Sequence, residues 1–174
     1  FIDLAGPKPT PAKYFETFVK FAKEPKNAVK PEHLGGHLIR ALSAREKWGA
    51  EERKLLLDFL QALDSVQQRR AWLDAVIAHP HAEFVMPIIE TLKKCPADDT
   101  HLRQAAKIAL RNCLVVTPDN FAKLIGTDEK TDLLLAEALL GARSAGGASK
   151  LVAIVKARDL PAPMLAAAAE FVGR

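Results

Sequence analysis

The amino-acid sequence predicts an all-α fold, a right-handed α–α superhelix of about five antiparallel helix hairpins. Three observations predict it. Apolar residues recur at the spacing of one helix face through most of the 174 residues. No segment sustains the apolar–polar alternation of a half-buried strand. The helical segments are each about three turns long and are joined by short connections, which makes neighbouring helices antiparallel.

Four helices are expected in the first half of the chain, at 11–24, 32–42, 50–63 and 65–77. Pro11 suits the first turn of the first helix, and Pro25 ends it. Ser65 and Gln68 are spaced for reciprocal capping at the start of the fourth. The side chains expected to face inward are Phe15, Phe18, Val19, Ala22, Leu34, Leu38, Ala41, Leu42, Leu56, Phe59, Leu60, Leu63, Val66, Leu73, Val76 and Ile77.

Six more helices are expected in the second half, at 84–95, 99–113, 117–124, 128–140, 148–157 and 161–172. The helix at 117–124 is short and begins at a Thr-Pro pair. The inward side chains of the first three are expected to be Phe84, Val85, Ile88, Ile89, Leu92, Leu102, Ala105, Ala106, Ala109, Leu110, Phe121 and Leu124. Later helices show a weak internal repeat, because second-helix apolar sets begin at Leu102, Leu133 and Leu165, 31 and then 32 residues apart.

The two cysteines are expected to be free and buried. Cys95 ends one expected helix and Cys113 ends the next. If these helices are antiparallel, the thiols lie roughly 20 Å apart at 1.5 Å rise per residue, which is too far for a disulfide.

One hairpin resembles a known family. The segment FVMPIIETLKKCPADDTHLRQAAKIALRNCL, residues 84–114, is similar to a HEAT repeat. Such repeats have a proline in the first helix, an Asp in the turn and an aliphatic-Arg-x-x-Ala-x-x-x-Leu second helix. The matching residues are Pro87, Asp98 or Asp99, Leu102, Arg103, Ala106 and Leu110. The resemblance implies an armadillo-like solenoid whose second helices line the concave side.

Residues 1–10, which are rich in proline, are expected to be a linker or tail. Residues 11–174 are then expected to form a single helical-repeat domain, part of a longer protein. No apolar run approaches the ~18 residues of a membrane span, so no membrane insertion is expected.

Two histidine pairs invite a metal-site interpretation. His33 and His37 are four residues apart, as in a zincin helix. The residue after His33 is a leucine where that chemistry needs a glutamate, so we interpret the motif as close helix packing at its glycines. His79-Pro80-His81 is interpreted as a turn or helix cap. No metal or cofactor is expected.

GARSAGGASK, residues 141–150, has a faint phosphate-loop spacing. Gly147 stands where the phosphate-binding lysine would be required, and no strand precedes the segment. We interpret it as a loose loop between hairpins.

The strongest candidate for an interaction surface is a cationic stripe. Arg103, Lys107 and Arg111 recur every four residues, opposite Ala106 and Leu110. A solvated helix face is the simpler alternative, since acidic residues are nearly as numerous as basic ones. The second candidate surface is made of Arg69, Arg70 and Trp72. Trp72 is interpreted first as a partly buried anchor; alternatively, these residues form an exposed binding hot spot.

These features favour a non-catalytic scaffold that binds another protein or another domain of its own chain. The alternative is a nucleic-acid-binding domain with a basic concave face, similar to the helical-repeat alkylpurine DNA glycosylases. The net charge of +4 permits an anionic partner. Neither hypothesis assigns catalytic residues.

Overall fold

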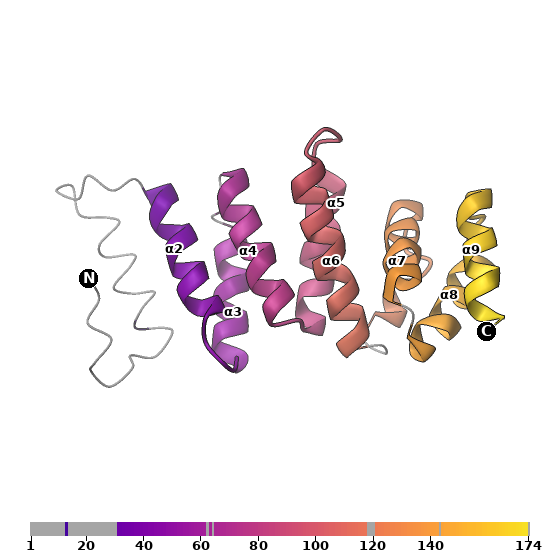
Figure 1. Cartoon of the computed structure of the whole chain (residues 1–174), viewed down its shortest axis with the longest axis horizontal. Helices are drawn as coiled ribbons and strands as arrows, with labels where there is room; N and C mark the ends of the chain where they lie inside the picture. Colours follow the sequence, from indigo (N-terminus) through magenta and orange to yellow (C-terminus); the bar gives the residue numbers. More distant parts are fainter. Residues whose placement is uncertain are drawn as a thin grey trace. The chain divides into compact units, whose positions relative to one another are not determined.

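The structure, a computed structural model, describes residues 13, 31–61, 63, 65–117, 121–142 and 144–173. The expected tail at 1–10 and helix at 11–24 lie outside these residues, except for Lys13. In the described residues the regular structure is entirely helical, with eight α-helices, two short 3-10 helices and no strand (Figure 1). The predicted all-α class is confirmed. The chain divides into two compact units, Phe1–Ala75 and Val76–Arg174, and each is described by itself.

The first unit contains α2 (Pro31–Ser43), α3 (Ala50–Leu60) and most of α4 (Val66–Ala78). Its α2 and α3 pack through one apolar cluster, which consists of Leu38, Leu42, Leu55 and Phe59. Trp48 covers this cluster, and its indole N–H donates to the Leu42 carbonyl over 2.9 Å. The loop between the two helices is thereby held against their shared core.

The expected capping of α4 is confirmed. The Gln68 N–H donates to Ser65 Oγ over 3.2 Å, and the Ser65 N–H donates to Gln68 Oε1 over 3.3 Å. Two donors at the helix start are thus satisfied reciprocally. The expected inward direction of Val66 is wrong, since it is 51% exposed. Val66 is the first residue of α4 and lies two turns before the buried Leu73, at the exposed start of the helix.

The second unit continues with the 3-10 helix η1 (Ala82–Phe84), α5 (Val85–Lys94) and α6 (Thr100–Val116). The α5 and α6 helices pack together, and every side chain expected to face inward on them is buried. Asp99 caps α6 by accepting a hydrogen bond of 3.0 Å from the Leu102 N–H. Pro87 lies in the first turn of α5, where its missing N–H costs no intrahelical hydrogen bond.

After the 3-10 helix η2 (Ala122–Leu124) come α7 (Glu129–Ala142), α8 (Ala145–Ala157) and α9 (Ala162–Val172). Contacts join α6 to α7, α7 to α8, α8 to α9 and also α7 to α9. Each helix therefore packs on its neighbours in the chain. The buried Ala106, Ala136 and Ala168 occupy matching positions on α6, α7 and α9, spaced by 30 and then 32 residues.

This spacing corrects the repeat expected from the leucines. Leu133 is only half-buried, and Leu165 is 44% exposed. In the observed register, Asp132 on α7 stands where Leu102 stands on α6, and both are buried. The sequence repeat was misplaced by one residue on α7 because a buried carboxylate occupies a position that an apolar pattern would assign to leucine.

Candidate functional site

A shallow pocket lies between α6 and α7. It is lined from α6 by Gln104, Lys107, Ile108, Leu110 and Arg111, and from α7 by Leu134, Glu137, Ala138 and Gly141. We call it the α6–α7 groove. Most of these residues recur at three- and four-residue spacing on each helix, so they form one stripe on α6 and one on α7.

Two contacts fix how the helices run beside each other. The Lys107 ammonium pairs with the Glu137 carboxylate across the groove. One turn further along both helices, a Cβ atom on Gly141 would lie 3.5 Å from Arg111 Cδ. Both contacts join residues that are 30 positions apart. The two helices therefore run in the same direction, in register, with the groove between them.

Of the three cations in the predicted stripe, the structure brings Lys107 and Arg111 to the groove, and it directs Arg103 elsewhere. Arg103 is half-buried, and its guanidinium donates to the Cys95 carbonyl over 3.3 Å at the end of α5. A cation at a helix C-terminus is favourable because the last carbonyls carry partial negative charge. Arg103 thus stabilises the hairpin between α5 and α6.

Arg111 differs from Lys107 in its exposure and in its polar contacts. The Lys107 side chain is 35% exposed and its charge is matched by Glu137. Arg111 is exposed, and within the part of the chain that the structure describes its guanidinium has neither an ion pair nor a hydrogen bond. Opposite it, Gly141 presents no side chain. The end of the groove near Arg111 therefore combines a cation without a counter-charge and a small-residue floor.

The prediction of a second interaction surface at Arg69, Arg70 and Trp72 is partly wrong. Trp72 is completely buried, and its indole N–H donates to the Leu56 carbonyl over 2.7 Å. It is a core anchor, as the first interpretation held, and the alternative of an exposed hot spot at Trp72 is wrong. Arg70 is exposed and Arg69 is half-buried. These two remain a prediction, without the aromatic side chain that would have made them a hot spot.

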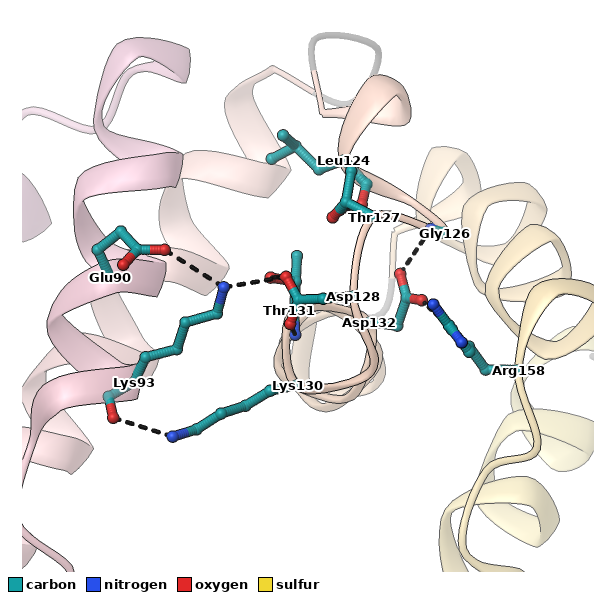
Figure 2. Close-up of polar contacts among 10 residues, drawn as sticks. All are labelled: Glu90, Lys93, Leu124, Gly126, Thr127, Asp128, Lys130, Thr131, Asp132 and Arg158. Carbon is teal, nitrogen blue, oxygen red and sulfur yellow. Dashed lines mark hydrogen bonds and ion pairs between the residues drawn. The ribbon is translucent and has the colours of Figure 1, made fainter.

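A polar network at the start of α7 was not foreseen from the sequence (Figure 2). Asp128 precedes α7, and its carboxylate accepts from the Thr131 N–H over 2.9 Å and from the Thr131 hydroxyl over 2.6 Å. The Lys93 ammonium, on α5, reaches the same carboxylate at 3.0 Å and Glu90 at 3.2 Å. The hydrogen bonds from Thr131 and the charge of Lys93 hold the pKa of Asp128 well below its usual range. The hydrogen bond to Asp128 raises the pKa of Lys93.

The network continues on the other side of α7. Asp132 is completely buried and accepts from Arg158 Nε over 3.1 Å and from the Gly126 N–H over 2.8 Å. Gly126 has a φ of 84°, in the left-handed region that favours glycine. That turn aims the Gly126 N–H at the carboxylate. Arg158, just after α8, reaches Asp132 from the next helix (Figure 2).

The chemistry of this network is structural. The carboxylates of Asp128 and Asp132 each accept at least two hydrogen bonds, and each pairs with a cation from another helix. The lowered pKa of Asp128 makes its carboxylate a poor proton acceptor. The network ties α5, α7 and α8 together beside the groove. The signal in the sequence was the Asp-x-x-Thr spacing at 128–131, which is typical of a helix start.

The histidine motifs lie apart from the groove residues in the sequence. Gly35 is buried, and a Cβ on it would lie 3.2 Å from the Gln68 amide, so the predicted close packing is confirmed at this glycine. At Gly36 the prediction is wrong, because a Cβ there would meet no described atom within 4 Å. His37 is exposed, and the side chain of His33 lies outside the described residues. His81 caps η1, with its Nδ1 accepting from the Glu83 N–H over 3.4 Å. The interpretation of 79–81 as a turn and cap is confirmed.

The prediction of a loose loop at residues 141–150 is largely wrong. The α7 helix extends to Ala142, and α8 already begins at Ala145. Ser144 caps α8 by accepting a hydrogen bond of 3.2 Å from the Gly147 N–H. The two glycines, 146 and 147, lie in the first turn of the helix, where this cap offsets their poor helix propensity.

Comparison with known proteins identifies no relative: no protein-family model, no curated protein and no solved structure matches the chain. The described residues contain no group of three or more His, Cys, Asp or Glu side chains that could hold a metal ion. None of the helices in these ranges is long and apolar enough to cross a membrane.

Proposed function

We propose that the chain is a non-catalytic helical-repeat scaffold of the HEAT-like kind, which binds another protein or another domain of its own chain. The observation that carries this proposal is the α6–α7 groove. It lies between two packed helices and ends at Arg111, an exposed cation that has no counter-charge among the described residues. A surface of this kind suits contact with a partner.

The repeat part of the proposal is supported by the packing of the second unit. The α6 helix packs on α7, and α7 packs on α9; each of these helices buries an alanine, at Ala106, Ala136 and Ala168, and leaves other residues exposed. In a solenoid, each hairpin buries one face against the next, and the exposed faces of successive hairpins form an extended concave binding surface. In this proposal, residues 11–174 belong to one helical-repeat domain.

Nucleic acid is the less favoured partner. Residues 76–174 contain twelve lysines and arginines against eleven aspartates and glutamates, whereas nucleic-acid-binding domains concentrate basic charge. The groove lining includes the acidic Glu137 and contains no aromatic side chain on which a base could stack. These features favour a protein ligand.

Selection of peptides from a displayed random library on the immobilised full chain tests this proposal. We expect a convergent set of sequences, whose synthetic versions bind saturably with one site per chain. Titration with a single- and a double-stranded oligonucleotide in rising salt is the counter-test. Two results together would contradict the proposal: the selection yields no convergent sequence, and the chain binds oligonucleotides with an affinity that falls steeply with salt. They would indicate nucleic-acid binding instead.

A further inference from the structure

We infer that the end of the α6–α7 groove nearest Arg111 binds an acidic segment of a partner protein, in which a carboxylate and an aliphatic side chain lie one helical turn apart. This inference rests on the proposed function and specifies the ligand. The carboxylate pairs with the Arg111 guanidinium, and the aliphatic side chain packs on Ile108 and Ala138.

The charges in the groove point to this ligand. Glu137 already matches Lys107, which leaves one positive charge in the groove, on Arg111. A guanidinium presents parallel N–H donors that fit a carboxylate in a bidentate pair. A single carboxylate restores neutrality there. A phosphodiester chain, by contrast, would bring successive charges past Glu137, which would repel them.

The shape of the groove also favours a ligand with a carboxylate and an aliphatic side chain. Gly141 has no side chain, and the neighbouring Ala138 is 7% exposed, so the floor on the α7 side is shallow and apolar. Ile108 is half-buried and lies one turn before Arg111 on α6. An apolar contact and a cation are therefore separated by three residues along a helix, roughly 4.5 Å at 1.5 Å rise per residue. A ligand with the same separation of groups contacts both.

The test uses the full chain and a designed probe, a blocked alanine-rich helical peptide carrying Leu and Glu three residues apart. Its partner probe has Gln in place of Glu. Anisotropy of a dye on each peptide gives the Kd, and nuclear magnetic resonance of arginine Nε–Hε groups and of backbone amides reports where the peptide binds. We expect the Glu probe to bind about tenfold more tightly than the Gln probe and to shift signals of Arg111 and its neighbours.

Two substitutions change the groove, and a third is the matched control. Arg111→Gln should weaken binding of the Glu probe about tenfold and leave binding of the Gln probe unchanged, because the two changes remove the same pair. Gly141→Leu fills the floor and should weaken both probes about tenfold. Lys156→Gln removes an equal charge from an exposed position of α8 and should alter the Kd less than twofold.

Three results would overturn the inference. Equal binding of the Glu and Gln probes excludes carboxylate recognition. An equal loss of affinity in Arg111→Gln and Lys156→Gln reduces the effect to general charge attraction. Displacement of the Glu probe by an oligothymidylate through the same residues reassigns the groove to nucleic acid. If library selection on the full chain still yields peptides that bind elsewhere, the scaffold function stands while this inference fails.

Discussion

The buried carboxylate of Asp132 on α7 pairs with the guanidinium of Arg158, 3.1 Å away at the end of α8. The carboxylate side chain is completely inaccessible, and the arginine side chain is 38% exposed. A buried charge costs free energy unless it is paired and hydrogen-bonded. This pair therefore makes the packing of α8 on α7 depend on one polar contact.

Arg158→Met should destabilise the protein more than Asp132→Asn. The methionine leaves a buried carboxylate with only the Gly126 N–H, which we expect to cost about 2 to 3 kcal/mol of unfolding free energy. The asparagine keeps an acceptor for that N–H and should cost about 1 kcal/mol. Urea denaturation measures both. Lys156→Met, at an exposed position of α8, is the control and should change stability by less than about 0.5 kcal/mol. The reverse order of the two effects would contradict the structural role of the pair.

Asp128 should stabilise the fold in a pH-dependent way. Its pKa is lowered in the folded state by the Thr131 hydrogen bonds and by Lys93. The stabilisation is therefore fully present above the unfolded pKa of about 3.9, and it is lost as the pH falls through the folded value. In urea denaturation from pH 3 to 7, the difference between wild type and Asp128→Asn should be constant above about pH 5 and shrink on acidification.

A second variant checks that Thr131 contributes to this effect. Thr131→Val removes only the hydroxyl that donates to Asp128 and keeps the backbone N–H. It should reduce the same acid-dependent stabilisation by a smaller amount. Parallel stability curves for wild type and Asp128→Asn over the whole pH range would show that the carboxylate has no such role.

The two thiols should react at very different rates. Cys113 is completely buried, and burial raises the pKa of its thiol to about 11. Cys95 is half-buried at the end of α5. Because the thiolate is the reactive form, N-ethylmaleimide at pH 8 should add one label quickly and a second only in denaturant. Intact mass spectrometry counts the labels. Rapid double labelling of the folded chain would contradict the burial of Cys113.

The sequence predicted where helices start better than it predicted which residues pack together across helices. Ser65 with Gln68, and Asp99 before α6, are local signals, and both operate as caps. The inward faces of α5 and α6 were also predicted, because their apolar spacing is regular. Trp72 and Leu56 are 16 positions apart in the sequence, so the burial of Trp72 was only one of two alternatives.

The candidate site was predicted in part. Spacing on one helix placed Lys107 and Arg111 on one face, but their surroundings depend on the register of α6 against α7, which no local pattern specifies. The burial of Asp132 could not be predicted either, because it too depends on contacts between helices. Its partner Arg158 is 26 residues away, and the apolar pattern therefore favoured Leu133 as the inward residue.

The α9 helix should be the least protected helix of the second unit. Ala168 is its only buried residue, and Leu165 and Val172 are each 44% exposed. Few buried contacts give a low local opening free energy. Hydrogen exchange followed by mass spectrometry should show at least tenfold faster exchange in α9 than in α6. Equal protection would mean that another surface covers the apolar side of α9. Leu165→Lys should change stability by less than about 0.5 kcal/mol.

The parallel, in-register packing of α6 and α7 creates the groove, and disulfide trapping tests it most directly. In a Cys95→Ser background, Arg111→Cys combined with Gly141→Cys should form a disulfide readily on mild oxidation, because these positions face each other. Arg111→Cys combined with Leu134→Cys places the thiols seven residues out of register, about 10 Å along the helix axis, and should not cross-link. Efficient trapping of the second pair and none of the first would contradict the register.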